Sequence, residues 1–187
     1  LNMTGGDVGQ NYGGSIAGNN VAAHLNISHC VFFNNRAGDV GGAIYAREFI
    51  MGQPNLFFSF VRFTENNASS SGGAVYLYKA KLVDHSSMYN MNTAVYGGAL
   101  SLSSGSFSSF YNSSLVSNTA GGGGGGICIG GSSSSSSFLD MSSVTLQSNK
   151  QTDGGTNGQY GGGGLYLYGK VTANIRECTF IRNEATE

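Results

Sequence analysis

Length, composition and charge exclude several classes of protein at the outset. The chain has 187 residues, of which 40% are hydrophobic and only 10% are charged, and its formal net charge is −1. A chain of this length can bury a substantial core, but this charge attracts neither nucleic acid nor an anionic membrane. No apolar segment is long enough to span a bilayer.

Glycine is the compositional outlier, with 31 residues, and a fixed period in such a chain indicates order rather than disorder. Two short patterns alternate along the sequence. The pattern Gly-Gly-small-aliphatic occupies residues 13–16, 41–44, 72–75, 97–100, 124–127 and 162–165. A large apolar residue followed three positions later by Asn occupies residues 32–35, 63–66, 89–92, 115–118, 146–149 and 180–183. The repeat length, roughly 25 to 38 residues, is typical of solenoids.

Alternation of apolar and polar residues predicts strands in chain order at 25–27, 30–32, 56–63, 75–78, 100–102, 127–129, 139–146, 165–168 and 173–180. No stretch has the 3.6-residue period of a helix. A strand pair in each repeat is too short to bury its own apolar face, so the repeats must stack on one another. We therefore predict an all-β fold, a right-handed single-stranded parallel β-helix of about six coils. Residues 1–187 are expected to form one segment of a longer repeat protein.

Stacking predicts columns of equivalent residues about 4.8 Å apart. The expected interior columns are Ile16, Ile44, Val75, Leu100, Ile127 and Leu165; Ala46, Leu77, Leu102, Ile129 and Leu167; Cys30, Val61, Val144 and Cys178; and Phe32, Phe63, Tyr89, Leu115, Leu146 and Phe180. The glycine pairs suit corners that need positive φ or close backbone approach. A ladder of amides between coils, with αL tolerated at the turn, is expected for Asn35, Asn66, Asn92, Asn118, Asn149 and Asn183.

The paired motifs resemble the repeats of the chlamydial polymorphic outer-membrane proteins, written GGA[ILV] and FxxN. Residues 41–44, 72–75 and 97–100 fit the first motif fully, and residues 32–35, 63–66 and 180–183 fit the second. The other copies depart, with Gly or Ser in place of Ala and Tyr or Leu in place of Phe. The resemblance implies a surface-exposed β-helix, extracellular or on the cell surface, with a role in adhesion or display. It carries no catalytic residue to this chain.

Parallel β-helices also form the scaffold of polysaccharide lyases and glycoside hydrolases, so a carbohydrate-active enzyme is the alternative. Such enzymes need gathered carboxylates, whereas the acids here are scattered. The densest polar cluster, Lys79, Lys81, Asp84 and His85, is interpreted as a solvated turn. The histidines lack metal-ligand spacing, and residues 121–126 are interpreted as corner glycines because no Lys-Ser/Thr end follows them. We expect no enzyme, no metal and no cofactor.

Outward positions after the Gly-Gly corners predict an exposed aromatic stripe for sugar stacking or lateral packing. Its residues are Tyr45, Tyr76, Tyr78, Cys128, Tyr166 and Tyr168, and Cys128 is the thiol expected to be reachable from outside. Tyrosine also favours strands in general, which leaves a purely structural interpretation open. Four sequons, at Asn2, Asn26, Asn67 and Asn112, predict outward glycosylation sites in a eukaryotic secreted protein.

These patterns favour a structural or adhesive segment of an extracellular fibre or surface protein. Its expected partners are glycans and other copies or segments of a surface assembly that stack on the ends of the β-helix.

Overall fold

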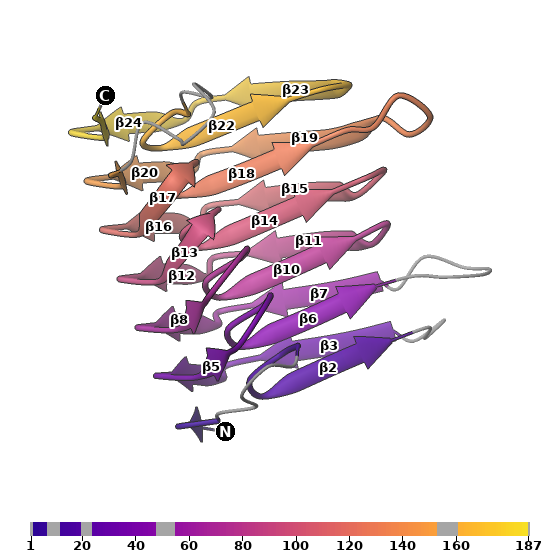
Figure 1. Ribbon diagram of the computed structural model, residues 1–187, viewed down its shortest axis with the longest axis vertical. Coiled ribbons are helices and arrows are strands. Elements are labelled where there is room, and N and C mark those ends of the chain that lie inside the picture. The colour runs from indigo at the N-terminus through magenta and orange to yellow at the C-terminus, as the bar shows by residue number, and fades with distance from the viewer. Residues whose placement is uncertain (1, 7–11, 20–23, 48–54, 153–160, 187) are drawn as a thin grey trace.

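The computed structural model describes residues 2–6, 12–19, 24–47, 55–152 and 161–186. Within these ranges there is no helix, and the coils stack from the N-terminus at one end to the C-terminus at the other (Figure 1). Each strand pairs in parallel with the equivalent strand of a neighbouring coil. The predicted parallel β-helix of about six coils is confirmed.

The described strands form four parallel sheets. The front sheet contains β2 (Ile16–Asn19), β6 (Ile44–Arg47), β10 (Val75–Tyr78), β14 (Leu100–Ser103), β18 (Ile127–Gly130) and β22 (Leu165–Tyr168). The back sheet contains β3 (His24–Ser28), β7 (Asn55–Ser59), β11 (Lys81–His85), β15 (Phe107–Tyr111), β19 (Ser137–Ser142) and β23 (Val171–Arg176). The Phe sheet contains β1 (Asn2–Thr4), β4 (Val31–Phe33), β8 (Arg62–Thr64), β12 (Met88–Asn90), β16 (Ser114–Val116), β20 (Thr145–Gln147) and β24 (Thr179–Ile181). The Ala sheet contains β5 (Arg36–Ala37), β9 (Asn67–Ala68), β13 (Thr93–Tyr96), β17 (Thr119–Gly123), β21 (Lys150–Gln151) and β25 (Glu184–Ala185).

The register between coils agrees with the predicted columns. Val75 pairs with Ile44 on one side and with Leu100 on the other, and all three side chains are fully buried. In the Phe sheet the rings of Phe32, Phe63 and Tyr89 stack with centroids 4.9 Å apart at each step. Much of the interior is thus filled by rows of similar apolar residues.

The second predicted strand of each repeat is in fact two strands, which corrects the expectation of a strand pair. Residues 56–63 are divided between β7 and β8 because Phe60 adopts a left-handed conformation, with φ 53°. The residue at this corner has no fixed type, since the equivalent positions are His29, Phe60, Ser86, Asn112, Ser143 and Glu177, so the sequence around it still alternates like one strand. Each complete coil therefore carries four short strands rather than two.

A second left-handed residue lies directly before each ladder asparagine. The expected position of the αL conformation was the asparagine itself, so the structure moves it by one residue. Glu65 precedes Asn66 with φ 56°, and Met91 precedes Asn92 with φ 54°. For residues other than glycine, this conformation costs roughly 1–2 kcal/mol. The asparagine itself is needed for its hydrogen bonds.

At five of the six Gly-Gly corners the first glycine has a positive φ, with Gly162 as the exception, and at all six the second glycine lies close to neighbouring backbone. Gly72 has a φ of 67°. A Cβ atom on Gly73 would lie 2.1 Å from the carbonyl oxygen of Gly98 and 2.6 Å from the backbone nitrogen of Thr93. Because those atoms are backbone, no side-chain rotation relieves the clash.

The buried asparagines bond to one another between coils. The backbone N–H and the Nδ2 of Asn92 both donate to Oδ1 of Asn118, at 2.9 Å each. Nδ2 of Asn92 also donates to the carbonyl oxygen of Phe63, at 3.0 Å, while its own Oδ1 accepts two bonds from Asn66. Every polar atom of this side chain is therefore satisfied, as a buried amide requires.

One buried column was not predicted. Two residues after four of the ladder asparagines, the Ala sheet places a small side chain inward, and Ala37, Ala68, Ala94 and Ala120 are at most 5% exposed. Gln151 interrupts the column and is 1% exposed, with its Nε2 donating to the carbonyl oxygen of Gly121 at 3.3 Å. Alanine at this position lets the Ala sheet lie close to the ladder.

Candidate binding face

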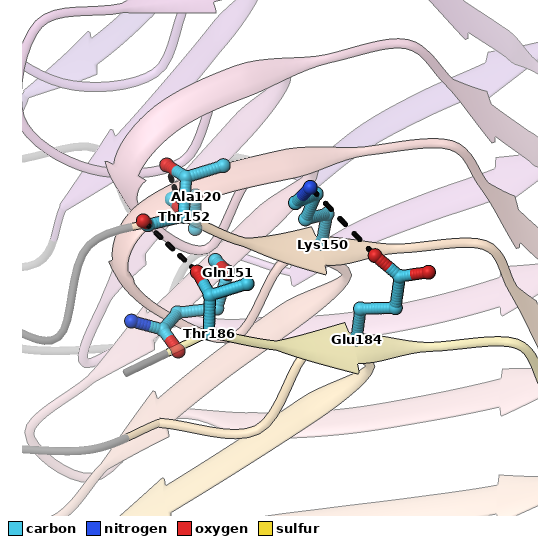
Figure 2. Close-up of polar contacts among 6 residues, drawn as sticks. All are labelled: Ala120, Lys150, Gln151, Thr152, Glu184 and Thr186. Carbon is cyan, nitrogen blue, oxygen red and sulfur yellow. Dashed lines mark hydrogen bonds and ion pairs between the residues drawn. The ribbon is translucent and has the colours of Figure 1, made fainter.

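Several acidic side chains of the described residues make structural contacts. Arg176 donates two bonds to the carboxylate of Asp140, and Lys150 lies 3.7 Å from Glu184. Figure 2 shows the Lys150–Glu184 pair beside the hydroxyl of Thr186, which donates to the carbonyl oxygen of Gln151 at 3.0 Å. Among the described residues, no group of three or more His, Cys, Asp and Glu side chains is placed to hold a metal ion.

Asp84 corrects the interpretation of its neighbourhood as a solvated turn. Its side chain is fully buried in the interior, in register with Phe58 and Phe110, while His85 points outward. Its Oδ2 accepts hydrogen bonds from Tyr89 at 3.2 Å and from Ser113 at 3.0 Å, and Oδ1 has no partner. Burial raises the pKa of Asp84 to about 6 and outweighs the hydrogen bonds, which lower it. A buried acid enclosed by core residues cannot reach an outside substrate.

The outward side chains of the front sheet form the most distinctive surface of the described chain. We call this surface the tyrosine face. One outward column runs through Tyr45, Tyr76, Ser101, Cys128 and Tyr166, and the next through Arg47, Tyr78, Ser103, Gly130 and Tyr168. These strands lie at the front of the stack in Figure 1. The six residues of the predicted stripe therefore share one face.

The expected exposure is wrong at two positions of this face. Tyr45 and Cys128 are each only 2% exposed. The ring of Tyr45 lies between those of Tyr12 and Tyr76, with centroids 4.7 and 5.8 Å away. Cys128 is a small residue beside Tyr166 of the next coil, and burial raises the pKa of its thiol to about 12. Cys128 is therefore a neutral, covered thiol and cannot meet an outside partner as expected.

A hollow interrupts the stripe where the outward residues are small. It has a volume of about 180 Å³ and is lined by Ser71, Tyr76, Tyr96, Ser101, Ser103, Tyr166 and Tyr168. Tyr76 lies three coils from Tyr166, a distance of about 14 Å at the usual strand spacing. Ser101 and Ser103 line the space between these walls. We call this the tyrosine hollow.

Glycines leave room for three of the tyrosine rings. A Cβ atom on Gly130 would lie 2.1 Å from Cζ of Tyr168, and one on Gly123 would lie 2.7 Å from Cδ1 of Tyr166. A Cβ atom on Gly122 would likewise lie 2.6 Å from Cε1 of Tyr96. The run 121–126 thus has two roles, because Gly124 and Gly125 build the predicted corner while Gly122 and Gly123 accommodate tyrosine rings. The sequence signal was the length of the run, which exceeds what a corner needs.

The hollow is electrically neutral near physiological pH. Burial raises the pKa of Tyr76 to about 12, and burial also raises the pKa of Tyr168. A raised phenol pKa favours the protonated, uncharged form. The remaining lining residues are serines and other tyrosines, so the hollow offers hydroxyl groups and aromatic faces without a formal charge.

A second, charged hollow adjoins the first on the other side of Tyr76. It has a volume of about 160 Å³ and is lined by Tyr12, Asp39, Val40, Tyr45, Arg47, Tyr76 and Tyr78. The guanidinium carbon of Arg47 lies 4.7 Å from the centroid of the Tyr78 ring. The tyrosine face therefore offers two neighbouring environments of different polarity.

Two of the sequon asparagines have exposed side chains. Asn26 lies on β3, and Asn112 lies at a corner with φ 53°. Asn67 is half-buried on β9, and the side chain of Asn2 lies outside the described part of the structure. Asn26 and Asn112 are accessible to a modifying enzyme, and glycosylation stays a prediction.

Comparison with known proteins identifies the repeat. Residues 29–47 and 60–78 match the Chlamydia polymorphic membrane protein repeat. Each matched segment begins at a left-handed corner residue, His29 or Phe60, and ends with a front-sheet strand, β6 or β10. No curated protein and no solved structure matches the chain significantly.

The match confirms the resemblance inferred from the two motifs and the expected location, extracellular or at the cell surface. In the parts of the chain described here, no helix is long and apolar enough to cross a membrane.

Proposed function

We propose that this chain is a structural or adhesive segment of its surface protein, and that the tyrosine face is its contact surface. The observation that supports this proposal is the tyrosine hollow, whose rings are seated on backbone glycines of a stacked scaffold. Tyrosine gives a large contact area at a low cost in conformational entropy, which suits recognition surfaces.

The carbohydrate-active enzyme has less support than this role. A glycosidase needs two carboxyl groups flanking one bond. Asp84 is enclosed in the core, and Asp140 is paired with Arg176. The repeat match is to a membrane-protein repeat and adds no catalytic residue.

An adhesion assay tests the proposal. Beads coated with residues 1–187 are passed over cell monolayers and matrix-coated surfaces, and retained beads are counted. The Ser103→Lys variant places a long cation in the tyrosine hollow, whereas Ser109→Lys places the same side chain outward on the back sheet. We expect Ser103→Lys to reduce retention and Ser109→Lys to leave it unchanged. Equal retention of the unsubstituted protein and both variants would show that the tyrosine face does not contribute to adhesion.

A second role, end-to-end stacking, is favoured by the coil that contains β22, β23 and β24. Residues that belong to interior columns are open to solvent there, with Leu167 41% exposed, Ile175 42% and Phe180 48%. A further β-helix coil, from whichever chain supplies it, would cover them and pair the free strand edges. Sedimentation at increasing concentration tests this role, and Phe180→Glu is expected to abolish any association. A monodisperse monomer at all concentrations would contradict stacking between copies.

A further inference from the structure

We propose that the tyrosine hollow binds a single neutral sugar ring of a glycan. This inference rests on the adhesive function proposed above and names the class of ligand that the contact surface takes. The ligand follows from four properties of the hollow: its lining, its neutrality, its packed walls and its size.

The lining matches the two chemical faces of a pyranose. Tyr76, on one side, and Tyr166 and Tyr168, on the other, present aromatic rings against which the C–H face of a sugar can pack. Ser71, Ser101 and Ser103 lie among them and supply hydroxyls that both donate and accept hydrogen bonds. The rings of Tyr166 and Tyr168 lie against each other, with centroids 5.7 Å apart, and form one wall.

The absence of charge in the lining selects against ionic ligands. No Asp, Glu, Lys, Arg or His contributes to this hollow as the structure describes it. A charged group placed there would lose hydration without gaining a counter-ion, which is costly. The neighbouring hollow, by contrast, contains Asp39 and Arg47. Charged sugars are therefore expected to be excluded from the tyrosine hollow.

The walls are already packed against neighbouring residues in the absence of a ligand. Gly123 and Gly130 leave room for the rings of Tyr166 and Tyr168, and any larger residue at either position would displace them. On the other side, Tyr76 packs against Tyr45 with an interplanar angle of 7°. A preformed site avoids part of the entropy cost of ordering side chains on binding.

The size of the hollow indicates recognition of one ring. Its volume of about 180 Å³ is below the range of roughly 300–1,000 Å³ that is typical of pockets for drug-sized ligands. We therefore expect a dissociation constant on the order of 1 mM for a monosaccharide. Useful adhesion would arise from many copies on one surface, because multivalency multiplies weak affinities.

Titrations followed by NMR test this inference. Methyl glycosides of glucose, galactose, mannose and N-acetylglucosamine are added to ¹⁵N-labelled residues 1–187, with sialic acid and glucuronic acid as the charged comparison. At least one neutral sugar is expected to shift the amides of Gly122, Gly123 and Gly130. Tyr168→Ala is expected to weaken that binding about five-fold, and Ser109→Lys is expected to leave it unchanged.

Several outcomes would overturn the inference. These are shifts only with the charged sugars, shifts centred on the back sheet, equal affinity in Tyr168→Ala, or no shift with any neutral sugar. Thermal unfolding and the ¹⁵N spectrum of Tyr168→Ala establish that the variant is folded.

The two proposals fail separately. If beads adhere through the tyrosine face while no neutral sugar binds, the proposed ligand class is refuted but the tyrosine face remains supported as the contact surface. If a neutral sugar binds but the beads do not adhere, the adhesive role is refuted and the tyrosine hollow remains supported as a sugar-binding site.

Discussion

The buried carboxyl of Asp84 should make the protein more stable in mild acid than at neutral pH. Its pKa is raised from an ordinary value of 3.8 to about 6 in the folded protein. Between these two values the folded state holds a proton that the unfolded state has released, so stability falls as pH rises. The contribution is fully present below pH 3.8 and is lost above about pH 6. A difference of about two pKa units corresponds to about 3 kcal/mol.

Denaturant unfolding between pH 4.5 and 7.5 measures this effect, and Asp84→Asn is the matched variant. An Asn side chain retains an oxygen that can accept from Tyr89 and Ser113, and it carries no charge at any pH. We expect the variant to be the more stable protein at pH 7.5, by up to about 3 kcal/mol, and to lose most of the pH dependence. If both proteins showed the same slope, the buried carboxyl would not be the source of that dependence.

Three further predictions concern the scaffold and the tyrosine face. Asn92→Ala should lower the unfolding free energy by about 4 kcal/mol because it leaves buried groups of Asn66 and Phe63 unpaired. The control Asn90→Ala changes a half-buried residue two positions away and should cost little. Equal losses in the two variants would refute the ladder's role. Gly73→Val should lower the unfolding free energy by more than about 3 kcal/mol, and an unchanged thermal midpoint would show that the corner is not tight. At pH 8, Cys128 should react with a disulfide reagent more slowly than Cys30 and Cys178, because its thiol is buried and has a pKa of about 12. Mass spectrometry of the labelled peptides measures the three rates. Labelling at equal rates would contradict the burial of Cys128.

The sequence was sufficient for the repeat and the columns because both depend on side-chain type at a fixed spacing. Val75, for example, had to lie between Ile44 and Leu100 once the glycine pairs were aligned, and the register agrees. Inward positions of stacked strands are occupied by apolar residues in every coil, so the pattern repeats and can be read directly.

The corners and the buried polar residues were harder to predict, for physical reasons. Left-handed corners such as Phe60 and Met91 carry no common residue type, so they leave little trace in one sequence. Asp84 occupies an inward position, as its register with Phe58 shows, and the alternation of residues in the strand indicates this. An isolated acid is usually solvated, however, and for that reason Asp84 is interpreted from the sequence as part of a solvated turn.

The tyrosine face could be predicted as a set of aligned positions but not as a shape. Whether Tyr45 is exposed depends on where the rings of Tyr12 and Tyr76 lie. Cys128 is covered within a face that alternation alone predicts to be open. Ring orientation over glycine backbone is a tertiary property, and no spacing rule describes it.

The parallel pairing of successive coils determines how the segment responds to pulling. Hydrogen bonds between coils run along the stacking direction, so tension applied between the two ends loads the rows of bonds one after another rather than all at once. A coil of roughly thirty residues that peels away releases about 100 Å of chain. We therefore expect such a scaffold to lengthen in steps under load while the coils that remain stacked keep their shape.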